Sequence, residues 1–515
     1  MEEKPREHSP SQRPERMSAS PSGWCFALFE EGQAGRQATA EVTSGSLTFS
    51  VGLVGLRAER RAAVVEENLH ALIGVWEGVR AAFTTPSFRL FITLAFGWVS
   101  TQGRHAVTQA LVEAGVAAHK HHEAFHRFFS RGTWKPDLLG RLFFELVVGL
   151  VPLAQLVFSL DDTLCPKRGP KVFGIGSHRD AVLSSGRYKV LRFGHVWVVL
   201  AVVVHLPFCP RPFALPLLFR LYRTSKECRR SGHVYRTKNQ LARQMLEVLL
   251  RWVPEGTLRV CMDGAYCNSR VVRGLPERLV LFGVARPDAC LTAAPPARKR
   301  GQRGRTPLRG QRLPSPQQLA RRRSGWQTLP LELYGQRRTL QVRSLVAQWY
   351  GTAGARLLHL VVVRQTGGNR TCRVFFCTQP DIDVTRLLQT YALRWPLEVT
   401  FRDLKQLLGF SQSSARLRKA VEHTAPFVGL LYTSLLLWAA RGGSSLAQLL
   451  MPARPWYHHK VHLSFADILH AAQRLLGQHQ PLLPCILESL CPTPKRREIR
   501  PQPRPPSDEG SFAAT

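Results

Sequence analysis

The sequence lacks the features that mark secreted, disulfide-linked or membrane-spanning proteins. Its eleven cysteines are an odd number and none stands in a C-x-x-C pair, which argues against a disulfide framework and a zinc site of the usual spacing. The first residues, MEEKPREHSPSQRPERM, contain no apolar segment typical of a secretory signal. The apolar runs 196–206 and 427–440 are shorter than the roughly 20 residues that cross a bilayer. We therefore expect a cytoplasmic protein with no membrane partner.

Negative charge is also scarce. The chain has 71 Lys and Arg against 35 Asp and Glu, which leaves a formal charge of +36 over 515 residues. Such an excess indicates a polyanionic partner. The cations are spread along the chain and do not form one basic amphipathic helix, so nucleic acid is favoured over a membrane surface.

No acidic residue occurs between residues 289 and 331. Uncompensated cations repel one another, so we expect this segment to face DNA phosphates, although a solvated loop is the alternative. The predicted phosphate-binding residues of this basic loop are Arg298, Lys299, Arg300, Arg303 and Arg305; Arg309, Arg312, Arg321, Arg322 and Arg323 follow them.

Apart from these scarcities, the composition is that of a globular protein, with 44% hydrophobic residues and room for two or three domains. Residues 1–50 have no sustained periodicity and are expected to be disordered. Residues 51–150 are predicted to be helical and to form a candidate DNA-end-binding region. Within it, 104–115 reads as a short amphipathic helix, either a recognition helix of the helix-turn-helix type or a plain bundle helix.

The next part of the chain predicts an α/β core. Strands are expected at 156–160, 190–204, 213–221, 258–262 and 279–284, with a helix at 238–252. The first strand ends on Asp161 and Asp162, and the fourth on Asp263. Buried acids are costly unless cations meet them. This order, followed much later by a helix with Glu398, matches the ribonuclease-H-like fold, in which acids on the first and fourth strands and a late helix converge.

Three further strand-like runs, at 340–349, 357–363 and 372–377, predict a β-rich subdomain inserted into this core. A helix at 427–440 is expected to close the core. The predicted boundaries are 151–291 and 380–440 for the two parts of the core, 292–379 for the basic loop and insertion, and 441–515 for a C-terminal region with a loose basic tail from Pro492.

The late helix is predicted to run from Asp383, as N-cap, to Gly409, as C-cap. At about 100° per residue, four of its side chains fall within roughly 60° of one face, and leucines line another. Pro396 should bend it. The alternative is a solvated ladder in which Glu398 pairs with Arg402. The four residues of the polar stripe are Tyr391, Arg394, Glu398 and Lys405.

Carboxylates from separated parts of the chain are suited to catalysis by two divalent metal ions. Asp162, Asp263 and Glu398 would supply only oxygen ligands, which favours Mg²⁺ over Zn²⁺. One ion activates the attacking oxygen and the other stabilises the leaving oxygen in phosphodiester cleavage.

These residues resemble those of the bacterial insertion-sequence transposases of the DDE superfamily, in the group with a Y-x2-R-x3-E-x6-K signature. Tyr391, Arg394, Glu398 and Lys405 match that spacing without a gap. The first acid in these enzymes is typically followed by Thr, so the resemblance selects Asp162 over Asp161, a choice that strand parity alone could not make. It also implies two Mg²⁺ ions, with Mn²⁺ as a substitute.

The resemblance further implies cut-and-paste transposition, in which metal-activated water cleaves the ends of an element and the freed 3′-hydroxyl attacks target DNA. Tyr391, Arg394 and Lys405 would then hold phosphates of the inverted-repeat ends. Synapsis of two ends implies a homodimer. The alternatives are a ribonuclease-H-like nuclease or resolvase without strand transfer, and an inactive DNA-binding derivative.

Overall fold

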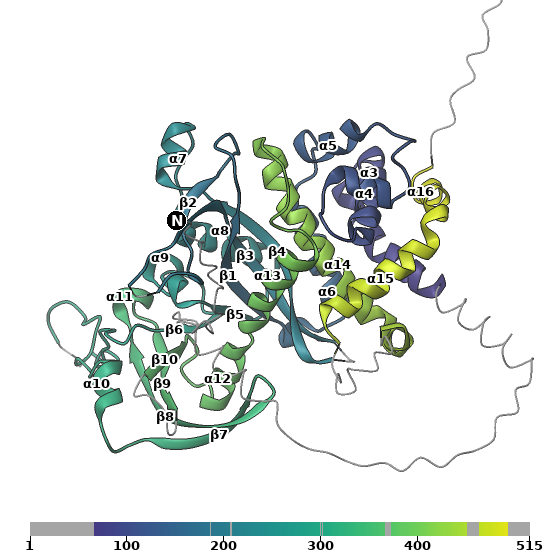
Figure 1. The fold of residues 1–515 in the computed structure, drawn as a ribbon. Helices are drawn as coiled ribbons and strands as arrows, with labels where there is room; N and C mark the ends of the chain where they lie inside the picture. The colour runs from purple at the N-terminus through teal and green to yellow at the C-terminus, as the bar shows by residue number, and fades with distance from the viewer. Residues whose placement is uncertain are drawn as a thin grey trace, which may run out of the picture.

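The structure, a computed structural model, describes residues 66–185, 187–206, 209–298, 300, 302–365, 372–450 and 463–492, with no side chains from 443 to 450. The expected disordered segment 1–50 and the expected tail after Pro492 lie outside the described residues. Within them, one sheet and the helices around it account for the architecture (Figure 1).

The sheet has ten strands in the order β2-β3-β1-β5-β6-β10-β9-β8-β7, and β4 also pairs with β3. The strands are β1 (Val157–Pro166), β2 (Gly176–Arg179), β3 (Leu191–Leu206), β4 (Cys209–Tyr222), β5 (Leu258–Met262), β6 (Leu279–Val284), β7 (Gln327–Leu333), β8 (Gln336–Gln348), β9 (Leu357–Gln365) and β10 (Cys372–Cys377).

The part of the sheet from β4 to β6 has the predicted ribonuclease-H-like order. β1 is antiparallel to β3, and β3 is antiparallel to β4. β5 is parallel to β1, with Leu160 opposite Met262, and β6 is parallel to β5. The mixed α/β fold class is therefore confirmed, and the register brings the residues that follow Leu160 and Met262 to the same position along the sheet.

The expected insertion is not a sheet of its own. β10 pairs antiparallel with β6, Phe375 opposite Val284, and β9, β8 and β7 continue outward from it. The three predicted strands are confirmed. β7 was not predicted, because Pro330 and the adjoining acid-free loop hide its alternation of apolar and polar residues.

Helices precede the sheet, as predicted. They cover 66–77, α3 (Thr85–Ser100), α4 (Val107–Glu113), α5 (His122–Ser130) and α6 (Pro136–Val148). Their aromatic side chains pack on α14 (Arg418–Leu450) through Phe427, which touches the rings of Phe91, Trp98 and Phe129 edge-on. α4 lies within the stretch proposed as a recognition helix, and that role stays a prediction.

The helix α14 is much longer than predicted. Its stretch Arg418–Gly442 is long and apolar enough to cross a membrane by length and composition, but 94% of that window is buried inside the protein. It is therefore placed as a core helix. The C-terminal region also contains two helices that were not predicted, α15 (Phe465–His479) and α16 (Leu483–Leu490), which pack on α3.

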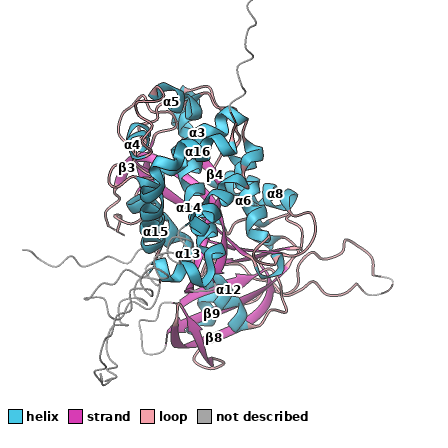
Figure 2. Ribbon diagram, turned by 90° about the vertical axis from the view of Figure 1, so that its right-hand side faces the viewer, coloured by secondary structure: helices cyan, strands magenta, loops and turns pink. Residues whose placement is uncertain are grey.

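Two layers of helices cover the two faces of the core sheet. Alternate residues of β1 identify these faces. Phe158 packs on Phe144 of α6, whereas the Ser159 hydroxyl donates to the Arg394 carbonyl, 3.3 Å away, on the opposite face. α8 (Lys238–Trp252) lies with α6, and α12 (Val384–Ala392) and α13 (Trp395–Leu407) lie on the Ser159 face. Figure 2 shows most helices gathered at one end of the molecule and β8 and β9 at the other.

Short elements complete the described chain. They are η1 (Arg80–Ala82), η2 (Leu153–Gln155), α7 (Ser225–Arg230), η3 (Gly264–Tyr266), α9 (Ser269–Val272), α10 (Pro316–Arg321), α11 (Tyr350–Ala353) and η4 (Gln480–Leu482). Among them, η3 follows the fourth core strand directly and carries the site described next.

Candidate active site

The helix predicted from Asp383 to Gly409 is two helices. α12 ends at Ala392 with Leu393 as its C-cap, and α13 has Arg394 as its N-cap and Pro396 in its first turn. Proline is tolerated there because the first turn has no intrahelical acceptor for its missing N–H. The predicted helix is thus interrupted at Leu393 and Arg394, both of which keep helical backbone angles. The Asp383 cap is confirmed, since its carboxylate accepts from the Arg386 N–H at 3.0 Å, and Gly409 follows α13 with a φ of 64°.

The interruption lies among the four residues that were expected to form one polar stripe. Tyr391 is 7% exposed and its ring lies 4.9 Å from that of Phe375, within the apolar cluster between α12 and β6–β10. Tyr391 is also close enough to Arg394, which contacts Glu398, for the two side chains to interact electrostatically, so the single stripe stays a prediction. The predicted contact between Tyr391 and a DNA phosphate is not favoured by this burial.

Arg394 lies between two carboxylates. Its Nη1 is 2.7 Å from Asp161 Oδ2, and its Nη2 is 2.5 Å from Glu398 Oε1. Its side chain is 5% exposed, and the buried Nε has no hydrogen-bond partner. A guanidinium in this position neutralises the site from within, so it would have to leave these carboxylates to hold the phosphate that the sequence assigns to it.

Asp161 therefore shares a face with Glu398, and Asp263 is close by. Burial raises the pKa of Asp161 to about 8, against the opposing effect of Arg394, and the negative charges of Asp263, Asp162 and Glu398 raise it further. This carboxyl group has too little positive charge around it, even with the guanidinium in contact.

Asp162 points to the other face of β1. Its Oδ2 is 2.6 Å from the Lys238 ammonium at the start of α8, and its Oδ1 accepts a hydrogen bond of 2.6 Å from the Tyr266 hydroxyl. Burial, and then the charge of Asp162, raise the pKa of Tyr266 well above its ordinary value, so the phenol remains a donor. Asp162 thus connects β1 to α8 and to η3.

The selection of Asp162 over Asp161 disagrees with this geometry. The following threonine is a feature of the sequence, whereas side-chain direction is set by the alternation of β1, which turns Asp161 to Arg394 and Glu398. Asp162 is instead engaged by Lys238 and Tyr266. The structure thus brings Asp161, and not Asp162, to the face that carries the predicted glutamate.

Asp263 is the N-cap of η3, and its Oδ2 accepts from the Ala265 N–H at 3.2 Å. No ion pair to Asp263 occurs among the described residues. It is half-buried at the end of β5, where the parallel pairing with β1 places it beside Asp161. Arg394 interacts with Asp263 through charge alone, in contrast to its direct pairing with Asp161 and Glu398.

The donor chemistry of this site fits a divalent cation. Its carboxylate oxygens are the ligands that Mg²⁺ prefers, and burial first, then the neighbouring carboxylates, raise the pKa of Asp161. In the described part of the chain, however, no three His, Cys, Asp or Glu side chains are arranged to hold a metal ion. The guanidinium of Arg394 takes the place between Asp161 and Glu398, so these two and Asp263 would hold an ion only after it moves.

The family follows from a comparison with known proteins. A family model described as DDE superfamily endonuclease matches residues 80–354, more than half of the chain. The chain belongs to this endonuclease family. The match includes Asp161, Asp162 and Asp263, and it ends before α13.

The chain is also similar, at low sequence identity, to a solved structure of a transposase. A solved structure described as the cryo-EM structure of piggyBac transposase synaptic complex with hairpin DNA is similar with a TM-score of 0.36 and 12% identity, over 79% of this chain and 76% of that chain. A likeness this low carries no argument about the site of the endonuclease. No curated protein matches the sequence.

Lys405, on α13 of the endonuclease, lies near Cys165, which is further along β1 than Asp161. Burial raises the pKa of the Cys165 thiol to about 11, and the nearby charge of Lys405 opposes that rise. Cys165 and Asp161 share a face of the strand because they are four residues apart. Lys405 is half-buried and no ion pair to it occurs among the described residues, so its phosphate contact stays a prediction.

The basic loop of the endonuclease is exposed. Arg298 donates 2.9 Å to the Gln302 carbonyl within the loop itself. No ion pair to its described arginines occurs in the described ranges. The predicted phosphate-binding residues that are described and exposed are Arg298, Arg300, Arg303 and Arg305; Lys299 lies outside the described residues.

The sequence did not indicate Lys238 or Tyr266 as site residues. Signals were present for both, since Lys238 opens a helix after the Thr237 capping box, and Tyr266 stands three residues after Asp263. Neither signal shows that both side chains meet Asp162, because that contact depends on how β1, α8 and η3 pack.

Proposed function

We propose that this endonuclease is a DNA transposase of an insertion sequence, which cleaves at the ends of the element and joins them to target DNA. The observation that carries the proposal is the convergence of Asp161, Asp263 and Glu398 from β1, β5 and α13 in a chain of the DDE endonuclease family. The Y-x2-R-x3-E-x6-K spacing from Tyr391 to Lys405 supports the bacterial insertion-sequence group.

Endonucleases of this superfamily generally use divalent metal ions. When bound, the metal would supply activation of the attacking oxygen and stabilisation of the leaving oxygen, and we propose two Mg²⁺ ions, replaceable by Mn²⁺. The residues that would hold them are Asp161, Asp263 and Glu398. Asp162, which the sequence assigned as a ligand, would hold an ion only after leaving Lys238 and Tyr266.

The other residues position the reactants. Arg394, released from Asp161 and Glu398, would present its planar fork to a phosphate of the DNA end, and Lys405 would make a point contact about three turns along α13. Holding the phosphate in line with the attacking oxygen reduces the entropic cost of bringing the two reactants together. In the first step water attacks the phosphodiester and the 3′-oxygen leaves as a hydroxyl. In the second step that hydroxyl attacks a phosphodiester of the target strand, a new P–O bond forms, and the target's own 3′-oxygen leaves as a hydroxyl.

The partners follow from charge and reaction. A charge of +36 and the exposed basic loop favour double-stranded DNA, both inverted-repeat ends and target. Joining two ends requires synapsis, for which we propose a homodimer. We propose a cytoplasmic location, associated with the nucleoid.

The test uses two DNA substrates, one with intact element ends and one with a pre-formed 3′-hydroxyl, at saturating Mg²⁺. The wild type should cleave the first and join the second to a target. Glu398→Gln should lose both reactions while retaining DNA binding, because it removes a carboxylate charge and keeps the shape. Cleavage without any joining would leave a nuclease or resolvase in place of a transposase.

A specific observation favours one alternative. The guanidinium of Arg394 lies between Asp161 and Glu398, where a metal ion would bind. Among the described residues, no three ligand groups are arranged to hold a metal. Both features are expected of an inactive DNA-binding derivative. DNA binding without cleavage in either Mg²⁺ or Mn²⁺ would support that alternative.

A further inference from the structure

The protein has a second polar region, away from the acids, in a cavity at the outer edge of β4. The cavity has a volume of about 470 Å³. It lies where α6 and α8, on one face of the sheet, approach the beginning of α14 on the other. Its walls include Trp197, Phe219, Leu241 and Gln244 as well as charged residues.

Positive charge predominates in these walls. The five cationic side chains are Lys135, Arg220, Arg223, Arg236 and Arg418, against the carboxylates of Asp137 and Glu422 in the walls and of Glu227 behind Arg223, which leaves an excess of two positive charges. His423 adds none at neutral pH, because burial lowers its pKa to about 4.

Internal pairing accounts for only some of these cations. Arg220 makes a two-pronged contact with Asp137, at 2.8 and 2.6 Å, and Arg418 contacts Glu422 at 3.3 Å. The buried Nη1 of Arg223 has no hydrogen-bond partner, and its nearest carboxylate oxygen, on Glu227, is 3.8 Å away. A buried guanidinium nitrogen without an acceptor is a costly feature unless a ligand supplies one.

Lys135 and Arg236 make up the excess positive charge of the cavity walls. Both are exposed, and no hydrogen bond or ion pair of either side chain occurs in the described part of the chain. Lys135 comes directly before α6, and Arg236 comes two residues before Lys238, the partner of Asp162. These two cations, from different parts of the chain, thus line one cavity.

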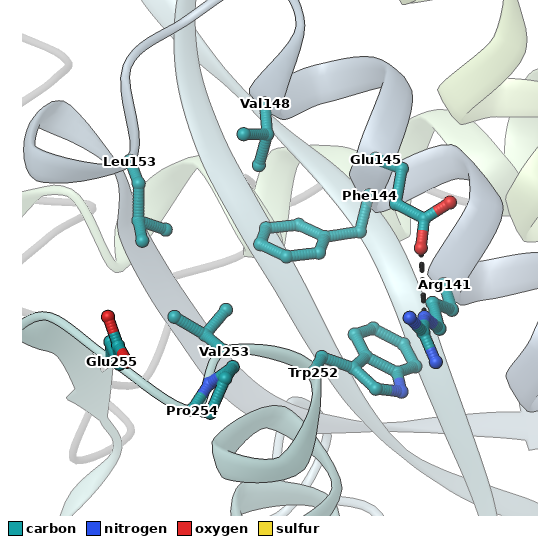
Figure 3. Close-up of a pocket in the computed structure, with 9 residues that line it drawn as sticks. All are labelled: Arg141, Phe144, Glu145, Val148, Leu153, Trp252, Val253, Pro254 and Glu255. Atoms are coloured by element: carbon teal, nitrogen blue, oxygen red, sulfur yellow. Dashed lines mark hydrogen bonds and ion pairs between the residues drawn. The ribbon is translucent and has the colours of Figure 1, made fainter.

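A second cavity of the protein lacks this excess of positive charge. Figure 3 shows a cavity of about 390 Å³ between α6 and the end of α8, lined by Phe144, Val148, Leu153 and Trp252. Its single cation, Arg141, is paired with Glu145 at 2.9 Å, and Glu255 adds a further negative charge. An anion is therefore disfavoured there and favoured in the β4-edge cavity.

We propose that the β4-edge cavity is a phosphate subsite that holds a backbone phosphate of DNA through Lys135, Arg236 and Arg223. The proposal rests on the proposed function for its choice of DNA over a free phosphate. β4 is two strands from β1, roughly 10 Å at about 4.8 Å per strand, so the phosphate would lie within a few nucleotides of the cleaved bond.

The test measures the affinity of the full-length protein for duplex DNA as a function of salt. Lys135→Ala/Arg236→Ala should reduce the slope of log K against log salt by about 0.9 for each phosphate that is no longer neutralised. The matched control is Lys120→Ala/Arg251→Ala, which removes the same two residue types from exposed positions outside the cavity and should change the slope less. All of these side chains are exposed, so the variants should fold, and their thermal midpoints should match that of the wild type.

A second arm distinguishes the two sources of phosphate. Millimolar inorganic phosphate is added without DNA, and thermal stability is measured for the wild type and the double variant. An unchanged DNA slope with phosphate stabilisation confined to the wild type would overturn the DNA assignment in favour of a small phosphate ligand. No difference in either arm would overturn the subsite. Failure of the wild type itself to bind DNA would instead count against the proposed function.

Discussion

The two neighbouring aspartates in the middle of β1 have different surroundings. β1 continues to Pro166 instead of ending at them as predicted, so both lie within the strand. Asp161 faces Arg394, Asp263 and Glu398, and burial raises its pKa to about 8. Asp162 faces Lys238 and Tyr266 and is satisfied by one cation and one hydrogen bond. The difference shows that a strand gives adjacent acids separate roles: one joins a cluster with excess negative charge, and the other joins three elements together.

The largest expected effect separates these two roles directly. Asp161→Asn should reduce Mg²⁺-dependent cleavage of an element end by at least about 1000-fold, or roughly 4 kcal/mol of transition-state stabilisation, because it removes a ligand charge. Asp162→Asn should cost only about tenfold, since it weakens a positioning contact. Cleavage rates at saturating Mg²⁺ measure both, and Asp288→Asn, an exposed change far along the chain, is the control.

The reverse ranking, with Asp162→Asn inactive and Asp161→Asn active, would contradict the assignment. It would mean that this part of β1 turns over when DNA or metal binds. Circular dichroism and thermal midpoints would show whether either variant has merely unfolded.

The next effect concerns the cations that neutralise the two aspartates. Arg394→Met should lower the free energy of unfolding by about 3–5 kcal/mol, because it leaves Asp161 buried without its partner. Lys238→Met should cost about 1 kcal/mol or less, since that ammonium is 37% exposed. Denaturant unfolding measures both. A double variant, Asp161→Asn/Arg394→Met, should recover part of the larger loss, and no recovery would place the cost elsewhere than in the ion pair.

A smaller effect is expected on the Asp162 side. Tyr266→Phe removes the hydroxyl that donates to Asp162 and so loosens η3, which carries Asp263 at its start. We expect a loss of about 1.5–3 kcal/mol at most from a hydrogen bond to a charged group. The Mg²⁺ concentration for half-maximal cleavage should rise while the maximal rate changes little. Tyr222→Phe, whose hydroxyl is 3.4 Å from that of Tyr235, is the control; an equal shift there would exclude a specific role for Tyr266.

The sequence predicted the elements of this site better than their contacts. β5, β6, β10 and α8 have the predicted bounds, because their apolar periodicity is clear and their ends are marked by caps or turns. The choice between Asp161 and Asp162 depended on side-chain direction, which the bounds alone do not give. The interruption at Arg394 was missed because proline is compatible with the first turn of a helix as well as with a kink.

The pairing of β10 with β6 was not predictable for a different reason. Nearly ninety residues separate Val284 from Phe375, and nothing local in either strand specifies the other as its neighbour. The apolar seams of α15 and α16 were, by contrast, available in the sequence. The prediction gave the C-terminal region before Pro492 no helices, because proline and basic residues surround these two seams.

The smallest effect is expected for arginines that have no carboxylate partner among the described residues. In the part of the chain that the structure describes, Arg298, Arg300, Arg303 and Arg305 are exposed and lack carboxylate partners, in contrast to Arg394 and Lys238. Replacing these four with Gln should leave the free energy of unfolding within about 0.5 kcal/mol, as for ordinary surface changes. It should reduce the slope of log K against log salt by up to about 0.9 for each phosphate of duplex DNA that the loop no longer neutralises. A filter-binding titration over several salt concentrations measures the slope, and replacing the exposed Arg321, Arg322 and Arg323 by Gln shows whether the effect belongs to one end of the basic loop. An unchanged slope in both variants would make the loop a solvated surface and would leave DNA binding to the cations of the folded core.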